Sequence, residues 1–256
     1  MRRLTGSRSR MADRGLPRGL AENLAHYVAK DSQLKVPVDL IKLADRLGVH
    51  GVSEATMVED GRTTWIDGVP SIALRRDRPP DRKRFTLAHE IAHILIESKH
   101  TVAHRTFRLT HDDIETLCDQ VAAAILMPRS WIERYANRDR FNLSLIRLVA
   151  HRAQVSHAAA AVRITEVSGR TCILLRLQRA PKRWVVVGHA AVPLDIHGQI
   201  ELAPETSELF DDLPARRDSW QVLSLRTPRG SLEGHAHVDK AGKTCLALIT
   251  SLNRAI

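Results

Sequence analysis

The segment RFTLAHEIAHILIE, residues 84–97, constrains the chain most, because it places two histidines four positions apart in an apolar stretch of helical length. Positions i and i+4 share one face of an α-helix, so His89 and His93 can direct imidazole nitrogens to one point, as the first two ligands of a metal ion require. Glu90 is offset around the helix, where a general base for hydrolysis belongs. The alternative is an ordinary buried helix that contains histidines by chance.

A second helix, predicted over DDIETLCDQVAAAILMP at residues 112–128, offers the remaining ligands. Asp112, Glu115 and Asp119 fall at i, i+3 and i+7 on one stripe of this largely apolar segment. Burying three carboxylates is costly unless a cation neutralises them. We therefore predict Glu115 as the third metal ligand and Asp119 as the acceptor for the free ring N–H of a ligating histidine. An exposed acidic stripe is the alternative. Two histidines and a carboxylate suit Zn²⁺, and would also accept Mn²⁺ or Fe²⁺.

These two segments resemble the ImmA/IrrE family of zinc metallopeptidases. The lead-in Arg-Phe-Thr-Leu-Ala-His-Glu and the exit Ala-Ala-x-Leu-Met-Pro are characteristic of the family, and the Glu-x-x-x-Asp spacing is similar to that of the gluzincins. The resemblance is strongest over residues 63–135. It implies a zinc endopeptidase that cleaves a helix-turn-helix (XRE-type) repressor and so derepresses stress or DNA-damage response genes.

The order of the chain also resembles the IrrE/PprI type found in radiation-resistant bacteria, with a peptidase domain, a helix-turn-helix and a GAF-like domain. We accordingly expect a basic flexible tail at 1–19, the peptidase domain at 20–140, a helix-turn-helix at 141–168 and a β-rich sensor or docking domain at 171–256. The fold class is α+β, with a mainly helical, zincin-like peptidase domain that carries a small sheet. The resemblance implies a small-molecule ligand for the C-terminal domain, which no residue identifies.

The peptide substrate of such an enzyme is expected to add as a strand to an exposed sheet edge. Two strand-like runs flank Asp67-Gly68, the strongest hairpin signal in the chain. The second run, SIALRR at residues 71–76, leads toward the histidine helix and is the predicted edge, although a strand fully paired within the domain is the alternative. Its candidate substrate-binding residues are Ser71, Ile72, Ala73 and Leu74. The donor to the developing oxyanion stays open among His104, His111 and Tyr135.

The composition is informative about partners and location. A formal net charge of +10 favours a polyanionic partner and supports weak, salt-sensitive DNA association. No apolar run approaches the ~18 residues that span a bilayer, so no membrane partner is expected. The basic N-terminus lacks the apolar segment of a secretory signal, and three cysteines are too few for a disulfide framework. These observations indicate the cytoplasm.

A function of another class also fits these observations. The chain could be a transcriptional regulator that binds DNA or a protein and keeps a structural or vestigial metal site. Residues 156–164, SHAAAAVRI, are alanine-rich with few side chains able to read base edges, which favours packing or repressor docking over sequence-specific DNA binding. The intact Glu90 favours the peptidase, because a structural metal has no need of a general base.

Overall fold

The computed structural model describes residues 19–30, 35–97, 109–136, 141–192, 200–212, 219–227, 230–241 and 243–254. Helices and sheets are both present, which confirms the α+β class. The described residues group into two compact units: one runs to Ile132 and includes 150–156, and the other contains 133–149 and everything from 157 onward. The division into functional domains that the sequence suggests stays a prediction. Of the basic tail expected at residues 1–19, only Gly19 lies within the described residues.

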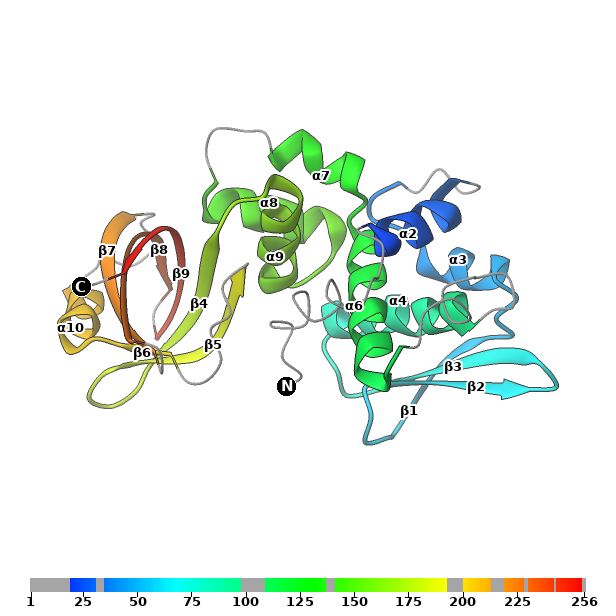
Figure 1. Cartoon of the computed structure of the whole chain (residues 1–256). Coiled ribbons are helices and arrows are strands. Elements are labelled where there is room, and N and C mark those ends of the chain that lie inside the picture. Colours follow the sequence, from blue (N-terminus) through cyan, green and yellow to red (C-terminus); the bar gives the residue numbers. More distant parts are fainter. Residues whose placement is uncertain are drawn as a thin grey trace. The chain divides into compact units, whose positions relative to one another are not determined.

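Four helices form most of the first unit (Figure 1). Local sequence signals explain where two of them begin. The Asp39 side chain caps α3 by accepting a hydrogen bond from the Lys42 amide. Thr110 and Asp113 form a reciprocal capping box at the start of α6. The helices are α2 (Leu20–Lys30), α3 (Leu40–Arg46), α4 (Pro80–Glu97) and α6 (His111–Leu126).

The packing of α6 on α4 makes the core of this unit. The buried positions of α4 include Ile91 and Ile94, and those of α6 include Leu117 and Val121. Arg84 in the first half of α4 fastens neighbouring segments, because its guanidinium donates to the Val38 carbonyl at 2.6 Å and to the Ala153 carbonyl at 3.2 Å. Arg84, the first residue of the histidine segment, therefore stabilises the contacts of α4 with its neighbouring segments.

A three-stranded sheet packs against α4, through β2 and β3. Its strands are β1 (Val52–Ala55), β2 (Gly61–Ile66) and β3 (Val69–Arg75), in the order β1-β3-β2. Asp67 and Gly68 both have positive φ in the predicted hairpin turn between β2 and β3, which suits a tight two-residue connection. In this sheet β2 and β1 are the outer strands.

The prediction that residues 71–76 form a free edge is wrong. Residues Ser71, Ile72, Ala73 and Leu74 lie on β3, the central strand, where Ile72 pairs with Val52 on one side and with Thr63 on the other. The short segment VSEA of β1 lacks a clear strand pattern, yet it supplies the parallel partner that covers β3. The outer strand nearest to the histidine helix is β2, which contacts α4 directly.

The second unit combines helices with a larger sheet. Its six antiparallel strands follow the order β5-β4-β9-β8-β7-β6, and the outer strands β5 and β6 approach each other so that the sheet nearly closes. Helix α9 packs on β4 and β5, and the acidic segment after residue 203 forms α10 with Pro204 in its first position. The strands are β4 (Cys172–Arg179), β5 (Trp184–Val192), β6 (Glu201–Leu202), β7 (Ser219–Thr227), β8 (Gly230–Ala241) and β9 (Thr244–Arg254). The helices are α8 (Leu143–Ala153), α9 (His157–Ser168) and α10 (Pro204–Asp212). The residues of α8 are divided between the two units. The short α7 (Arg129–Ala136) crosses from one unit to the other.

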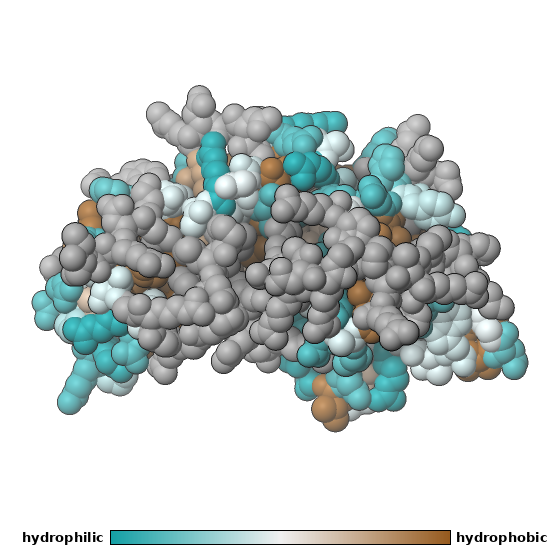
Figure 2. All heavy atoms as spheres, in the orientation of Figure 1, coloured by the Kyte–Doolittle hydropathy of each residue, from teal (hydrophilic) through white to brown (hydrophobic). Residues whose placement is uncertain are grey.

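The described surface is largely hydrophilic on the face drawn in Figure 2, with hydrophobic residues in small groups. One such group lies at the right-hand end, where Figure 1 places the β2–β3 turn. There Trp65, Ile66 and Val69 are 42%, 63% and 43% exposed. Within the described residues, no helix combines the length and apolar character needed to cross a membrane.

Candidate metal centre

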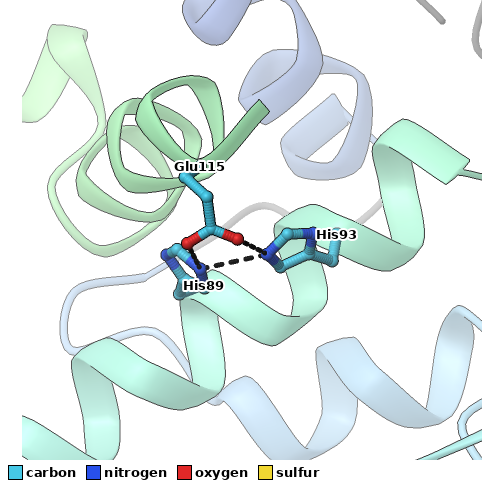
Figure 3. Close-up of side chains that lie close together, drawn as sticks. All are labelled: His89, His93 and Glu115. Carbon is cyan, nitrogen blue, oxygen red and sulfur yellow. Dashed lines mark hydrogen bonds and ion pairs between the residues drawn. The ribbon is translucent and has the colours of Figure 1, made fainter. Parts of the chain in front are cut away.

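Three side chains singled out by the sequence converge between α4 and α6. His89 and His93 project from one face of α4, and Glu115 reaches toward both from α6, as Figure 3 shows. The nitrogen Nε2 of His93 lies 3.1 Å from that of His89, and the Glu115 carboxylate oxygens lie 3.3 Å from His93 Nε2 and 3.7 Å from His89 Nε2. All three side chains are partly buried.

These separations fit a divalent metal ion. Ligand atoms about 2.0–2.1 Å from a tetrahedral zinc would lie about 3.3 Å from one another, close to the spacings of the three side chains. A set of two imidazoles and one carboxylate is also a common donor set for such ions, and it leaves a further coordination position open. The residues present therefore fit a metal.

Asp119 defines the orientation of His89. Its Oδ1 lies 2.8 Å from His89 Nδ1, so the ring donates from Nδ1 and turns the Nε2 lone pair toward His93 and Glu115. Burial lowers the pKa of His89, but the hydrogen bond and charge of Asp119, with the charges of Glu115 and Glu90, outweigh it and raise the pKa above the ordinary 6.5. Protons and a metal ion therefore compete for this ring.

Glu90 lies beside the cluster without belonging to it. Its side chain is buried, with 8% exposed, and its Oε2 accepts a 2.8 Å hydrogen bond from the Thr63 hydroxyl of β2. Gly61, also on β2, approaches so closely that a Cβ there would lie 2.8 Å from Glu90 Oε1. The outer strand of the sheet thus contacts the carboxylate that the sequence assigns as general base.

An ion network holds the start of β2 against α4. Asp60 accepts hydrogen bonds from Arg78 Nε at 2.6 Å and Arg82 Nε at 2.7 Å. The Asp60 carbonyl also accepts from the Arg75 amide at 2.9 Å. Because Asp60 immediately precedes Gly61, this network fixes the part of β2 that reaches Glu90.

Sequence reasoning missed Gly61, Thr63 and Asp60. Their roles depend on a strand meeting a helix about thirty residues later, and the only local signal was their place beside the Asp67-Gly68 hairpin. Asp112, placed on the acidic stripe, is exposed and lies outside the three-residue cluster.

The three oxyanion candidates differ in what the structure describes. His111 is near the cluster, with Nε2 4.0 Å from Glu115 Oε1. Tyr135 is buried and belongs to the second unit, and His104 falls outside the described residues.

A histidine pair and a glutamate around one point, with a buried glutamate adjoining, is the kind of site that defines a metallopeptidase. Comparison with known families agrees. Residues 44–165 match the family model described as the IrrE N-terminal-like domain, of the M78 peptidases. This part of the chain is similar to the ImmA/IrrE family of metallopeptidases, and a site of that kind implies a divalent metal.

Two curated relatives are each described as a radiation response metalloprotease IrrE. The protein from Deinococcus radiodurans is 39% identical over 126 residues, covering 46% of this chain and 38% of the relative. The protein from Deinococcus deserti is 36% identical over 92 residues, covering 34% of this chain and 33% of the relative. The matched region thus spans well under half of either relative.

A solved structure, of a Mycobacterium tuberculosis transcriptional regulator, is similar with a TM-score of 0.56 at 15% identity. The match covers 90% of this chain and 76% of that one. At this identity the likeness concerns the fold alone.

Proposed function

We propose that the chain is a zinc-dependent endopeptidase of the HExxH, gluzincin-like type that acts in the cytoplasm. In this proposal His89, His93 and Glu115 hold Zn²⁺, Asp119 orients His89, and Glu90 is the general base. The substrate is a helix-turn-helix repressor of the XRE type, whose cleavage derepresses stress or DNA-damage response genes. The observation that carries the proposal is the convergence of three metal-ligand side chains next to a buried glutamate.

Each residue has a definite task in hydrolysis. The chemistry that a divalent ion supplies at such a site is polarisation of the scissile carbonyl and activation of the attacking water. Glu90 accepts a proton from that water as it attacks, and delivers the proton to the leaving amine. Asp119 keeps His89 in one tautomer, because the Nδ1 proton stays in its hydrogen bond.

The substrate segment is best accommodated along β2 rather than β3. Within the described part of the chain, strand β2 has a partner on one side only, so a peptide in extended conformation can add to its outer edge through backbone hydrogen bonds. Gly61 and Thr63 of this strand already contact Glu90, which brings an added peptide close to the base. The exposed Trp65, Ile66 and Val69 at the hairpin turn would add apolar contacts.

The test is cleavage of a defined protein. The full chain, loaded with Zn²⁺, is incubated with the helix-turn-helix repressor encoded beside its gene, and products are identified by mass spectrometry. The proposal expects one cleavage that disappears with EDTA and in Glu90→Gln. Full activity of Glu90→Gln, or no metal-dependent cleavage, would refute it.

The helices α8 and α9 are proposed as a helix-turn-helix used for packing or repressor docking. Helix α9 packs on β4 and β5, and its buried residues include Ala160, Ala161 and Ile164. A helix covered in this way has less surface for a DNA groove, and the net charge then supports only weak, salt-sensitive DNA association. A DNA mobility shift that persists without metal would favour the regulator reading instead.

For the six-stranded unit we propose a GAF-like sensor role with a small-molecule ligand. A hollow of about 270 Å³ lies between the β5 end of the sheet and α10. Its lining combines apolar surface with charged groups, including Trp184, Ile200, Ser207, Glu208, Lys182 and Arg226. A thermal-shift screen of small polar metabolites against the wild type and Arg226→Ala tests this site.

A further inference from the structure

We propose that Thr63 and Gly61 of β2 are positioning residues for the Glu90 carboxylate, an inference that rests on the proposed peptidase function. The side chain of Thr63 holds one carboxylate oxygen, and the missing side chain of Gly61 leaves room for the other. The outer strand would then do two things at once: offer its edge to the substrate and aim the general base.

The Thr63 contact is a direct hydrogen bond. Its Oγ1 donates to Glu90 Oε2 at 2.8 Å, across 27 positions of the chain, and Glu90 is a buried group. A hydroxyl that donates to a buried carboxylate restricts rotation of the carboxylate and supplies a hydrogen bond that water would otherwise provide. Thr63 is partly buried, as a residue engaged with α4 should be.

Gly61 acts through the absence of a Cβ. An added Cβ would lie 2.4 Å from Thr86 Cγ2, 2.8 Å from Glu90 Oε1 and 3.1 Å from Glu90 Cγ. The backbone of Gly61 has no positive φ, so the need for glycine at this position is one of space. Any larger residue must push β2 away from α4 or turn the Glu90 side chain.

The two residues belong to one face of the strand. Side chains at i and i+2 of a strand point to the same side, so Gly61 and Thr63 both face α4, while Thr64 points the opposite way and is exposed. Thr64 is therefore a matched control of the same residue type, on the same strand, one position away. Thr63→Val removes the donor and keeps the shape, and Thr63→Ser restores it.

The activity test compares Thr63→Val, Thr63→Ser, Thr64→Val and Gly61→Ala in the repressor-cleavage assay described above. Loss of one hydrogen bond to a charged group corresponds to roughly a tenfold fall in kcat for Thr63→Val, with KM changed less than about twofold. Thr63→Ser should recover most of kcat, and Thr64→Val should match the wild type. Gly61→Ala should fall at least as far as Thr63→Val.

A second measurement needs no peptidase activity. Glutamate labelled with ¹³C at the carboxyl carbon gives one signal per residue, and the signal lost in Glu90→Gln identifies Glu90. At fixed pH in the metal-loaded full chain, this signal should move in Thr63→Val and Gly61→Ala and stay in place in Thr64→Val. Thr63→Ser should leave it near the wild-type position.

Together, kcat and the Glu90 carboxyl signal test the positioning role of Thr63 and Gly61 separately from the proposed peptidase function. If the wild type cleaves no repressor but the Glu90 signal moves as described, the positioning contact stands and the peptidase assignment fails. If the wild type cleaves and Thr63→Val matches Thr64→Val in both kcat and the Glu90 signal, the positioning proposal is overturned. Should Gly61→Ala fail to fold, the Thr63→Val and Thr63→Ser pair decides the outcome.

Discussion

Among single residues, Asp119 shows how one hydrogen bond orients a candidate metal ligand, His89. The imidazole of His89 has two nitrogens, and only the one not engaged by Asp119 Oδ1 can point toward His93 and Glu115. This hydrogen bond joins α4 and α6, and the helical spacing of apolar residues in both segments is visible in the sequence. The spacing of Glu115 and Asp119, one turn apart on α6, therefore predicted which carboxylates would come near the histidines.

We expect Asp119→Ala to weaken metal binding by about 10- to 100-fold, because such outer contacts orient the ligand and raise its basicity. Competition with a chromophoric zinc chelator at fixed pH measures the affinity. Asp112→Ala is the matched control, since Asp112 lies on the same helix but is exposed. Equal affinities for the two variants would contradict the role given to Asp119.

Metal binding should also weaken as the pH falls. The pKa of His89 is raised above 6.5, so its ring begins to take up a proton at a higher pH than an ordinary histidine, and a protonated ring cannot act as a ligand. The apparent affinity from the same chelator competition should therefore fall between pH 8 and pH 6 by about tenfold for each pH unit below that pKa. An affinity independent of pH over this range would contradict the assignment of His89 as a ligand.

At the scale of helices and strands, the ion network of Asp60 holds the start of β2 against α4. Burial raises the pKa of the Asp60 carboxyl, but the hydrogen bonds and charges of Arg82 and Arg78 outweigh it, so its pKa lies below the ordinary 3.8. A depressed pKa in the folded protein means that the ion network stabilises the fold above pH 3.8. That contribution is lost as the pH falls through the lowered pKa.

Asp60→Asn should reduce the free energy of unfolding by about 1 kcal/mol at pH 7, since the arginine partners are partly exposed. The difference from the wild type should shrink between pH 5 and pH 3. Urea unfolding of both proteins in EDTA measures it. Glu59→Gln, which breaks the neighbouring and more exposed pair with Arg62, should cost little at either pH. A constant Asp60→Asn difference across this range would contradict the network.

The sequence predicts elements that depend on local signals, and it fails where an element depends on pairing with a distant segment. The apolar spacing of α4 and α6 is local, and so are the capping box of α6 and the Asp67-Gly68 turn, so each of these elements could be predicted in place. Strand order is not local. Residues 71–76 look like an edge because Pro70 lacks an amide hydrogen, but β1, from an unremarkable VSEA segment, pairs along β3 from residue 72 onward. The substrate edge that we propose is therefore β2, the outer strand that contacts Glu90.

At the scale of the whole molecule, the three cysteines report on the two units separately. Cys118 lies on α6 between Glu115 and Asp119 in the first unit, and Cys172 and Cys245 lie on β4 and β9 in the second. All three are buried free thiols. Burial raises the pKa of each, that of Cys245 to about 12. Alkylation therefore requires local or global opening, because the thiolate is the reactive form.

Metal binding should slow the alkylation of Cys118 and leave the alkylation rates of the other two cysteines unchanged. Binding to the folded site lowers the open population of the first unit by the factor 1 + [metal]/Kd, so at a free metal concentration of 100 Kd the labelling of Cys118 by N-ethylmaleimide should slow about 100-fold. Cys172 and Cys245 should keep their rates, since they lie in the other unit. Mass spectrometry of the alkylated peptides over time measures all three rates in one experiment. Equal slowing would mean that the two units open together, and unchanged labelling of Cys118 in the presence of metal would contradict a metal site formed by α4 and α6.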